Sequence, residues 1–256
     1  LLFGGYMGLG EGFIAGTWST PSLRTLFRFG IANQEAFRTR LGGSSIARVI
    51  RKALRFVQRN SVSGSRRNIA FHYDLGNEFY KAWLDPSMTY SSGIFIDNSQ
   101  TLQDAQREKC KRIVDKLEIK AHHRILEIGC GWGSLAEYIA TETGAHVTAI
   151  TISKEQHTFT VQRIKKAGLQ DKVAVEMRDY RDVTGFYDRI VSVEMLEAVG
   201  EHYWEAFFNK INECLAHDGQ AMLQVITVPD SRFQAYRKKS DIIQQRIFPG
   251  GMLLSP

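Results

Sequence analysis

A glycine-rich turn that directly follows an apolar, strand-like run is the feature that most constrains the fold of this chain. Residues 124–128 read R-I-L-E-I, and the following G-C-G-W-G places Gly129, Gly131 and Gly133 at alternate positions. Such a turn lets the backbone approach a ligand at the N-terminus of the next helix, where a larger side chain would collide. Ser134 stands where the dinucleotide pattern G-x-G-x-x-G has its third glycine, so the turn favours a nucleotide-like ligand other than NAD.

The strand before the turn carries one acid, Glu127, next to its last residue. A carboxylate at this position suits a ligand that bears an amino group, because it can accept the hydrogen bonds of that group. The alternative interpretation is a tight strand-to-helix turn that binds no ligand.

Strand-like apolar runs alternate with helical patterns from about residue 101 onward. The expected strands cover residues 124–128, 146–152, 173–177, 189–195 and 221–227, and the expected helices lie near 102–117, 134–143, 154–167 and 201–215. This alternation predicts an α/β fold with a parallel sheet. Thr101 and Asp104 have the spacing of a capping box at the start of the first of these helices.

Positive charge is concentrated in one part of the chain. The 256 residues carry a net charge of +6, yet residues 24–68 alone hold 11 Lys and Arg against one acid. Residues 45–59 have apolar side chains at helical spacing and basic ones along another face, which indicates a basic amphipathic helix. Such a helix suits an anionic membrane surface, although its apolar stripe could equally pack inside a domain. Nucleic acid is a disfavoured partner, because the segment lacks a binding motif and interleaved aromatic residues.

The small polar run S-V-S-G-S at 61–65 marks the main boundary. We therefore expect a small basic N-terminal domain at 1–60, a linker and cofactor-lid segment at 61–100, and a Rossmann-like domain at 101–256 whose C-terminal end is missing. The chain starts with Leu and ends with Ser-Pro, which is typical of a fragment cut at both ends.

The apolar N-terminus and the cysteines exclude several classes of protein. Residues 1–16 are interrupted by six glycines and by Glu11, so they form neither a membrane span nor a signal peptide. Three widely spaced cysteines indicate neither a disulfide framework nor a zinc site, and we expect no metal. A reducing cytoplasm fits this cysteine content.

Eight ordered segments of the chain share the motifs of one family. They are L-G-E-G-F-I-A-G-T-W (9–18), N-I-A-F-H-Y-D-L-G-N-E-F-Y (68–80), W-L-D-P-S-M-T-Y-S-S-G-I-F (83–95), T-L-Q-D-A-Q (101–106), L-E-I-G-C-G-W-G (126–133), T-I-S-K-E-Q (151–156), D-R-I-V-S-V-E-M-L-E-A-V-G (188–200) and I-F-P-G-G (247–251). In these segments the chain resembles the cyclopropane-fatty-acyl-phospholipid synthase family of class I S-adenosylmethionine-dependent methyltransferases. The resemblance covers nearly the whole chain.

The resemblance implies a Rossmann-like sheet with a small, mainly helical N-terminal domain. It also implies transfer of a methylene or methyl group from S-adenosylmethionine to the cis double bond of unsaturated phospholipid acyl chains. A methyl-branched product, or a different small-molecule substrate, stays open. The expected location is cytoplasmic and peripheral at the inner membrane face, and a homodimer is one expected assembly.

The resemblance also assigns cofactor-binding positions. These are Tyr90, Ser91, Gly129, Gly131, Gly133, Thr151, Ile152, Ser153, Gln156, Asp179 and Tyr180. Tyr90 and Ser91 match a pair that closes over the methionine end of the cofactor, and Asp179 matches a position that faces the adenine. Two alternatives stay open, since Ser153 and Gln156 have the spacing of a capping box and Asp179 could be a solvated charge.

Glu197 matches the glutamate of the family's catalytic site, where a bound bicarbonate is thought to be the base. The alternative for Glu197 is an acid in the first turn of a surface helix. Ser92 stands where many members have cysteine, and Gln224 where they have histidine, followed by Ile226, whose backbone would be the matching contact. Both replacements keep hydrogen-bonding capacity, but neither supplies an imidazole, so bicarbonate is a less secure second ligand.

Overall fold

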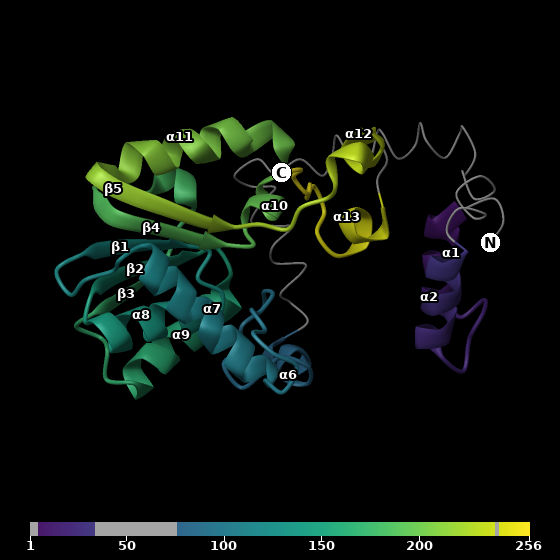
Figure 1. The fold of residues 1–256 in the computed structure, drawn as a ribbon, viewed down its shortest axis with the longest axis horizontal. Coiled ribbons are helices and arrows are strands. Elements are labelled where there is room, and N and C mark those ends of the chain that lie inside the picture. The colour runs from purple at the N-terminus through teal and green to yellow at the C-terminus, as the bar shows by residue number, and fades with distance from the viewer. Residues whose placement is uncertain (1–4, 34–75, 239–240) are drawn as a thin grey trace.

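The computed structural model describes residues 5–33, 76–238 and 241–256 (Figure 1). Within these ranges, every helix is too short or too polar to cross a lipid bilayer. The amphipathic helix expected at 45–59 and the boundary expected at 61–65 both lie outside the described residues.

Five parallel strands form one sheet in the order β3-β2-β1-β4-β5. The strands are β1 (Arg124–Ile128), β2 (His146–Thr151), β3 (Val173–Met177), β4 (Tyr187–Val193) and β5 (Leu215–Gln224). The strand order reverses between β1 and β4, because β1 pairs with β2 on one side and with β4 on the other. The predicted α/β fold with a parallel sheet is confirmed, and the reversal creates a crevice at the carboxyl ends of the strands.

Three strands end earlier than the sequence pattern predicts. Strand β2 stops at Thr151 and not at 152, and β4 stops at Val193 and not at 195. Strand β5 begins at Leu215 and not at 221, and it stops at Gln224 and not at 227, so that Ile226 follows the strand. For β4 the reason is a break in the backbone at Glu194, whose φ of +48° lies in the left-handed region. The apolar residues that follow the ends of β4 and β5 continue the apolar sequence pattern, but they are not part of the strands.

Helices cover both faces of the sheet (Figure 1), with α7 (Leu102–Lys116), α8 (Ser134–Thr143) and α9 (Lys154–Lys166) on one face and α11 (Trp204–Cys214) on the other. Shorter or more peripheral helices are α6 (Asn77–Lys81), α10 (Leu196–Val199), α12 (Asp230–Lys238) and α13 (Ile242–Arg246), with short 3₁₀ turns at Tyr180–Asp182 and Glu201–Tyr203. Because side chains alternate along a strand, Ile125 of β1 packs in the cluster of α7 and α8, while Leu126 packs in that of α11. The two clusters fix the strand β1 that leads into the glycine turn.

Helix α7 begins where the sequence predicts. The Thr101 hydroxyl accepts the amide of Asp104 at 3.2 Å, and the Asp104 carboxylate accepts the amide of Thr101 at 3.0 Å. Both halves of the predicted capping box are therefore present, which satisfies two amide groups that the helix leaves free.

The N-terminal part contains the helices α1 (Gly5–Ile14) and α2 (Leu23–Ala32), in keeping with the helical character expected there. Helix α1 approaches α13 closely, since a Cβ added to Gly10 would lie 2.2 Å from Cδ1 of Ile242. This contact joins the start of the described chain to a helix near its end.

Candidate active site

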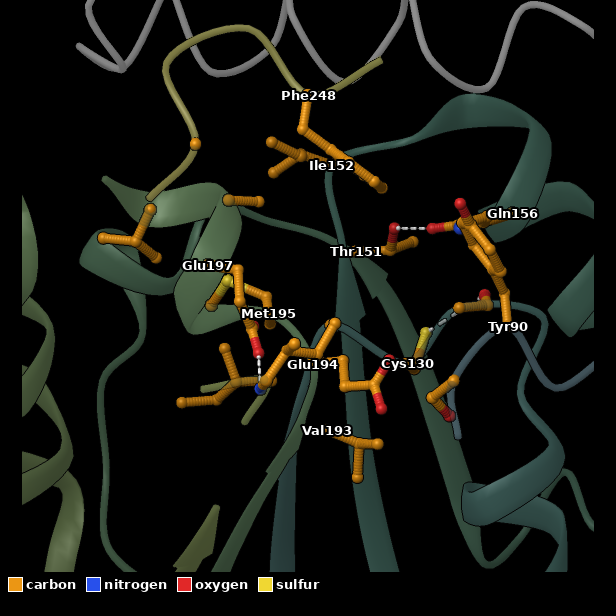
Figure 2. A pocket seen from close by; sticks show the side chains of 18 of the residues that line it. Tyr90, Cys130, Thr151, Ile152, Gln156, Val193, Glu194, Met195, Glu197 and Phe248 are labelled. Carbon is orange, nitrogen blue, oxygen red and sulfur yellow. Dashed lines mark hydrogen bonds between the residues drawn. The ribbon is translucent and has the colours of Figure 1, made fainter. Parts of the chain in front are cut away.

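A cavity of about 430 Å³ lies at the carboxyl ends of β1, β2 and β4 (Figure 2). Of the predicted site residues, its lining includes Tyr90, Ser91, Glu127, Gly129, Gly131, Thr151, Ile152, Gln156, Asp179, Tyr180, Glu197 and Ile226. Ser92, Gly133, Ser153 and Gln224 are not part of the lining. The structure thus gathers most of the predicted residues around one space at the point where the strand order reverses.

The three glycines of the turn have left-handed backbones, with φ of +84° at Gly129, +55° at Gly131 and +82° at Gly133. Their surroundings differ. A Cβ on Gly133 would lie 2.4 Å from Cγ2 of Thr160, whereas a Cβ on Gly131 would meet no protein atom within 4 Å. Gly133 is therefore required for packing against α9, while Gly131 leaves open the space at the cavity wall that a ligand would fill.

Glu127 is buried in the cavity wall with 4% of its surface exposed. Burial raises its pKa to about 8, against opposing effects of the Ala136 amide and the Lys109 ammonium. Among the described residues, its Oε2 atom has no hydrogen-bond partner. An orphaned carboxylate oxygen in a cavity is costly unless a ligand donates to it, so Glu127 fits the cationic amino group of S-adenosylmethionine.

The segment after β2 forms a small hydrogen-bonded group. The Thr151 hydroxyl donates to Oε1 of Gln156 at 2.9 Å, as the dashed line in Figure 2 shows. Ser153 accepts the amide of Gln156 at 3.3 Å and so caps α9. The reciprocal half of the expected capping box does not form, because the Gln156 side chain turns towards Thr151. Gln156 therefore faces the cavity while Ser153 has a structural role.

Asp179 follows β3 and is buried, with 2% of its surface exposed. Its carboxylate accepts the amide of Arg181 at 3.0 Å and the guanidinium of Arg181 at 3.2 Å. The interpretation of Asp179 as a solvated charge is thus wrong, since the side chain is enclosed and paired at the cavity wall. Contact between Asp179 and an adenine stays a prediction.

Residues before α7 close one side of the cavity. Tyr90 packs against Tyr80 and Trp83, with ring centroids 5.5 and 5.3 Å apart, and Trp132 of the glycine turn lies 4.8 Å from Tyr80. Arg163 of α9 donates to the carbonyls of Ser87 and Trp132, both at 2.8 Å. These contacts hold the expected lid segment against the glycine turn.

Lys109 of α7 is a site residue that sequence reasoning missed. Its side chain is 2% exposed, lines the cavity, and donates to the Ser91 hydroxyl at 2.5 Å. The signal was available in the sequence, because Lys109 falls on the stripe of α7 that also carries the buried residues Ala105 and Ile113. A lysine on the buried face of an amphipathic helix indicates a partner inside the fold.

Glu197 lies in the first turn of α10 and reaches into the cavity. One carboxylate oxygen accepts the amide of Ile226, as Figure 2 shows, and the other is buried without a partner among the described residues. Burial raises the pKa of Glu197. The structure therefore brings Glu197 and the Ile226 backbone together as predicted, and a surface position for Glu197 is wrong.

Ser92 and Gln224 meet around a second glutamate, Glu194, that the sequence did not single out. Glu194 lines the cavity, and its Oε1 atom accepts hydrogen bonds from both residues. Its left-handed backbone costs about 1 to 3 kcal/mol, so the surrounding structure must hold it in place. The only signal in the sequence was a second acid in the run E-M-L-E at 194–197.

Comparison with known proteins extends these observations. Residues 60–256 match the family model of mycolic acid cyclopropane synthetase. The chain is 36% identical over 269 residues to tuberculostearic acid methyltransferase UfaA1 of Mycobacterium tuberculosis, covering 98% of this chain and 60% of the relative. It is 35% identical over 264 residues to the cyclopropane-fatty-acyl-phospholipid synthase of Escherichia coli K12, covering 98% and 63%. The chain thus spans about three fifths of the length of these relatives.

A solved structure gives the same result. Mycolic acid cyclopropane synthase CmaA1, in a complex with SAH and CTAB, superposes with a TM-score of 0.68 at 29% identity. The superposition covers 74% of this chain and 70% of CmaA1. With the glycine turn, the parallel sheet and the family model in agreement, the chain belongs to the mycolic acid cyclopropane synthetase family of S-adenosylmethionine-dependent methyltransferases.

Proposed function

We propose that the protein transfers a one-carbon unit from S-adenosylmethionine to the cis double bond of an unsaturated phospholipid acyl chain, and that it makes a cyclopropane ring. The observation that carries this proposal is the set of side chains that line a single cavity. Glu127 and the glycine turn lie in one part of its wall, Glu194 and Glu197 in another, and apolar residues such as Phe248 line it as well. An acyl chain needs apolar walls, and the reaction needs a base beside the acceptor carbons.

The residues of the cavity fit the cofactor, as the orphaned oxygen of Glu127 and the open space at Gly131 indicate. Glu127 would bind the amino group, Tyr90 and Ser91 would close over the methionine end, and Thr151 and Gln156 would contact the ribose. When bound, S-adenosylmethionine supplies an electrophilic methyl group. The protein aligns the double bond with that group and excludes water, which is where most of the rate enhancement would arise.

A methyl-branched product is the second candidate. Its support is the similarity to tuberculostearic acid methyltransferase UfaA1, which is comparable in identity and coverage to that of the cyclopropane synthase from Escherichia coli. Both products begin with the same attack of the double bond on the methyl group, and they differ only in how the resulting cation is resolved.

Incubation of the complete gene product with S-adenosylmethionine and vesicles of monounsaturated phospholipid tests the proposal. We expect the acyl chains to gain the mass of one CH₂, and vesicles of fully saturated phospholipid to stay unchanged. NMR of the extracted lipid then distinguishes a ring from a methylene branch, which have the same mass. No mass gain on any monounsaturated phospholipid would contradict the proposed function.

We further propose that residues 24–68 dock the protein on the anionic inner face of the cytoplasmic membrane. The described part of this segment supports the idea, because α2 exposes Phe27 and Ile31 on the same short helix that carries Arg24 and Arg28. Apolar side chains that enter the interface and basic ones that attract anionic lipid act together, at about 1 kcal/mol for each basic residue.

Vesicle co-sedimentation tests the docking. A variant with Arg48, Lys52, Arg55 and Arg59 changed to Glu should lose most of its binding to vesicles that contain phosphatidylglycerol. The matched control changes Lys116, Lys120, Lys165 and Lys166 to Glu, which alters the net charge equally on exposed positions of the Rossmann-like domain. Equal loss in both variants would show that net charge alone is responsible, and unchanged binding of the first would overturn the docking site.

A further inference from the structure

Glu194 is held at the edge of the cavity in a conformation that glutamate rarely adopts. Its φ is +48°, directly after β4, and its amide donates to the carbonyl of Gln224 at the end of β5 at 2.8 Å. Non-glycine residues in this region of φ and ψ persist only where the surrounding structure enforces them, and they cluster at functional sites. The break in the strand directs the Glu194 side chain into the cavity (Figure 2).

One oxygen of the Glu194 carboxylate collects three hydrogen bonds. The Ser92 amide donates to Oε1 at 2.9 Å, the Gln224 side-chain amide donates at 2.8 Å, and the Ser92 hydroxyl also donates to it. Among the described residues, the other oxygen, Oε2, accepts no hydrogen bond, although the side chain lines the cavity. Glu194 is therefore fixed by one oxygen and presents the other to the space where an acyl chain would lie.

The same donors are the ones expected to hold a bicarbonate. Ser92 and Gln224 already donate to Glu194, so a second anion would have to displace that carboxylate or share its donors. It would also lie beside two carboxylates, Glu194 and Glu197. Neighbouring negative charges repel strongly in a partly buried site. Bicarbonate does not fit this arrangement.

We propose that Glu194 is the catalytic base of this protein and takes the place of a bound bicarbonate; this inference rests on the proposed function. The π electrons of the double bond form a carbon–carbon bond to the methyl carbon while the carbon–sulfur bond breaks and leaves its electron pair on sulfur. The new methyl group of the cation then loses a proton to Oε2 of Glu194. The released electron pair closes the cyclopropane ring, so that atoms and charges balance.

The proton then has a route to water. Ser92 is exposed, and its hydroxyl contacts the carboxylate that has received the proton. Glu197 has a different role, because one of its oxygens is bound to the Ile226 amide on the segment after β5. It positions that segment at the cavity wall.

The activity test compares the complete wild-type protein with Glu194→Ala in buffer freed of carbon dioxide. We expect the wild-type rate on monounsaturated phospholipid vesicles to be the same with and without added bicarbonate. Glu194→Ala should lose about 10²- to 10⁴-fold in rate, as expected for removal of a general base, and added bicarbonate or formate should restore about tenfold or more. Rescue should be much weaker in the triple variant Glu194→Ala/Ser92→Ala/Gln224→Leu, because only the Ser92 backbone amide then remains as a donor for the added anion.

Glu205→Ala, on the exposed start of α11, is the matched control and should behave as wild type. Calorimetric titration with S-adenosylmethionine shows that each variant is folded. A wild-type rate that depends on bicarbonate, a Glu194→Ala variant with the wild-type rate, or a folded Glu194→Ala variant that no small anion rescues would each overturn the assignment.

A second measurement does not need lipid turnover. The ¹³C resonance of labelled bicarbonate should stay sharp with the wild-type protein and broaden with Glu194→Ala, because the vacated donors then bind the anion. Specific broadening with wild type would overturn the inference. If the wild-type protein modifies no phospholipid, the proposed function fails, and this measurement still decides whether Glu194 occupies the anion position.

Discussion

The ammonium group of Lys109 donates a hydrogen bond to the hydroxyl of Ser91, with nitrogen and oxygen 2.5 Å apart. The contact joins α7 to the segment that closes over the cavity. Burial lowers the pKa of Lys109, and the nearby carboxyl groups of Glu194, Asp85 and Glu127 oppose that effect. Lys109 therefore holds the segment around Ser91 from inside the fold and not from the surface.

Replacement of Lys109 by Met should weaken the binding of S-adenosylmethionine about tenfold or more, because a buried charge-assisted hydrogen bond to Ser91 is lost. Calorimetric titration measures this change. The matched control is Lys111→Met on the same helix, where the lysine is exposed and pairs with Asp115 at 2.7 Å. A surface pair of this kind contributes little, so the control should bind as wild type does. Equal weakening in both variants would contradict the role of Lys109.

Glu127 should make the stability of the protein fall as pH rises. The folded protein keeps the proton of Glu127 up to about pH 8, whereas the unfolded chain loses it near 4.5. The stabilisation is thus complete below pH 4.5 and is lost through pH 8, with a total of a few kcal/mol.

Urea unfolding at about pH 5.5 and about pH 8.5 measures this dependence. Glu127→Gln should unfold with a flatter pH dependence and should be more stable than wild type at the higher pH, while binding S-adenosylmethionine more weakly. Glu205→Gln, which changes an exposed carboxyl, should follow the wild-type curve. Parallel curves for Glu127→Gln and wild type would show that this carboxyl does not titrate as the structure implies.

Two glycines of the turn should fail in different ways when changed to Ala. Gly133→Ala places a Cβ 2.4 Å from Thr160 and should lower the free energy of unfolding by about 2 to 4 kcal/mol. Gly131→Ala meets no protein atom, so it should cost only about 1 to 2 kcal/mol through its positive φ and chiefly weaken cofactor binding. Thermal unfolding and cofactor titration on both variants check this difference. Equal destabilisation, or unchanged cofactor binding in Gly131→Ala, would contradict it.

Arg163 should control the order of the lid. Its guanidinium donates to the carbonyls of Ser87 and Trp132 and pairs with Glu137 at 2.7 Å, with 16% of the arginine side chain exposed. Arg163→Met should speed hydrogen exchange of amides in residues 83–91 and weaken cofactor binding about tenfold.

Arg112→Met is the control for Arg163, since Arg112 is about half exposed and its contact with Glu108 is 3.7 Å long. It should leave exchange in residues 83–91 unchanged. Wild-type exchange in Arg163→Met would show that other contacts, such as the aromatic group around Tyr80, are sufficient to hold the lid.

The sequence predicts the sheet well where residue type and backbone conformation agree. Strands β1 and β3 and helix α8 have the bounds that their patterns predict, because polar residues or glycines flank each apolar run. The ends of β4 and β5 are not predictable in this way. Met195 and Val225 continue the apolar pattern, while the backbone has already left the strand at Glu194 for reasons that depend on tertiary contacts.

The residues of the candidate site also differ in whether the sequence alone could predict them. The glycine turn and Glu127 were predictable because the turn and the acid are contiguous in the chain. Arg163 and Glu194 were not, since each acquires its role from a segment far away in sequence. Glu194, for example, contacts Ser92 across 102 positions. For Lys109 the pattern of α7 indicates a buried lysine but does not identify Ser91 as its partner. Single-sequence patterns report local spacing, and these polar residues have no local partner that reveals their function.

The hydrogen bonds that Ser92 and Gln224 donate to Glu194 also bear on how such chains diverge. Loss of the carboxylate leaves both donors without this acceptor, and loss of either donor removes a hydrogen bond from Oε1 of Glu194. A change at one of the three positions is therefore unfavourable while the other two are kept. Positions 92, 194 and 224 should therefore vary as a linked set among homologues. The residues at these three positions would then separate groups of homologues that overall sequence identity does not separate.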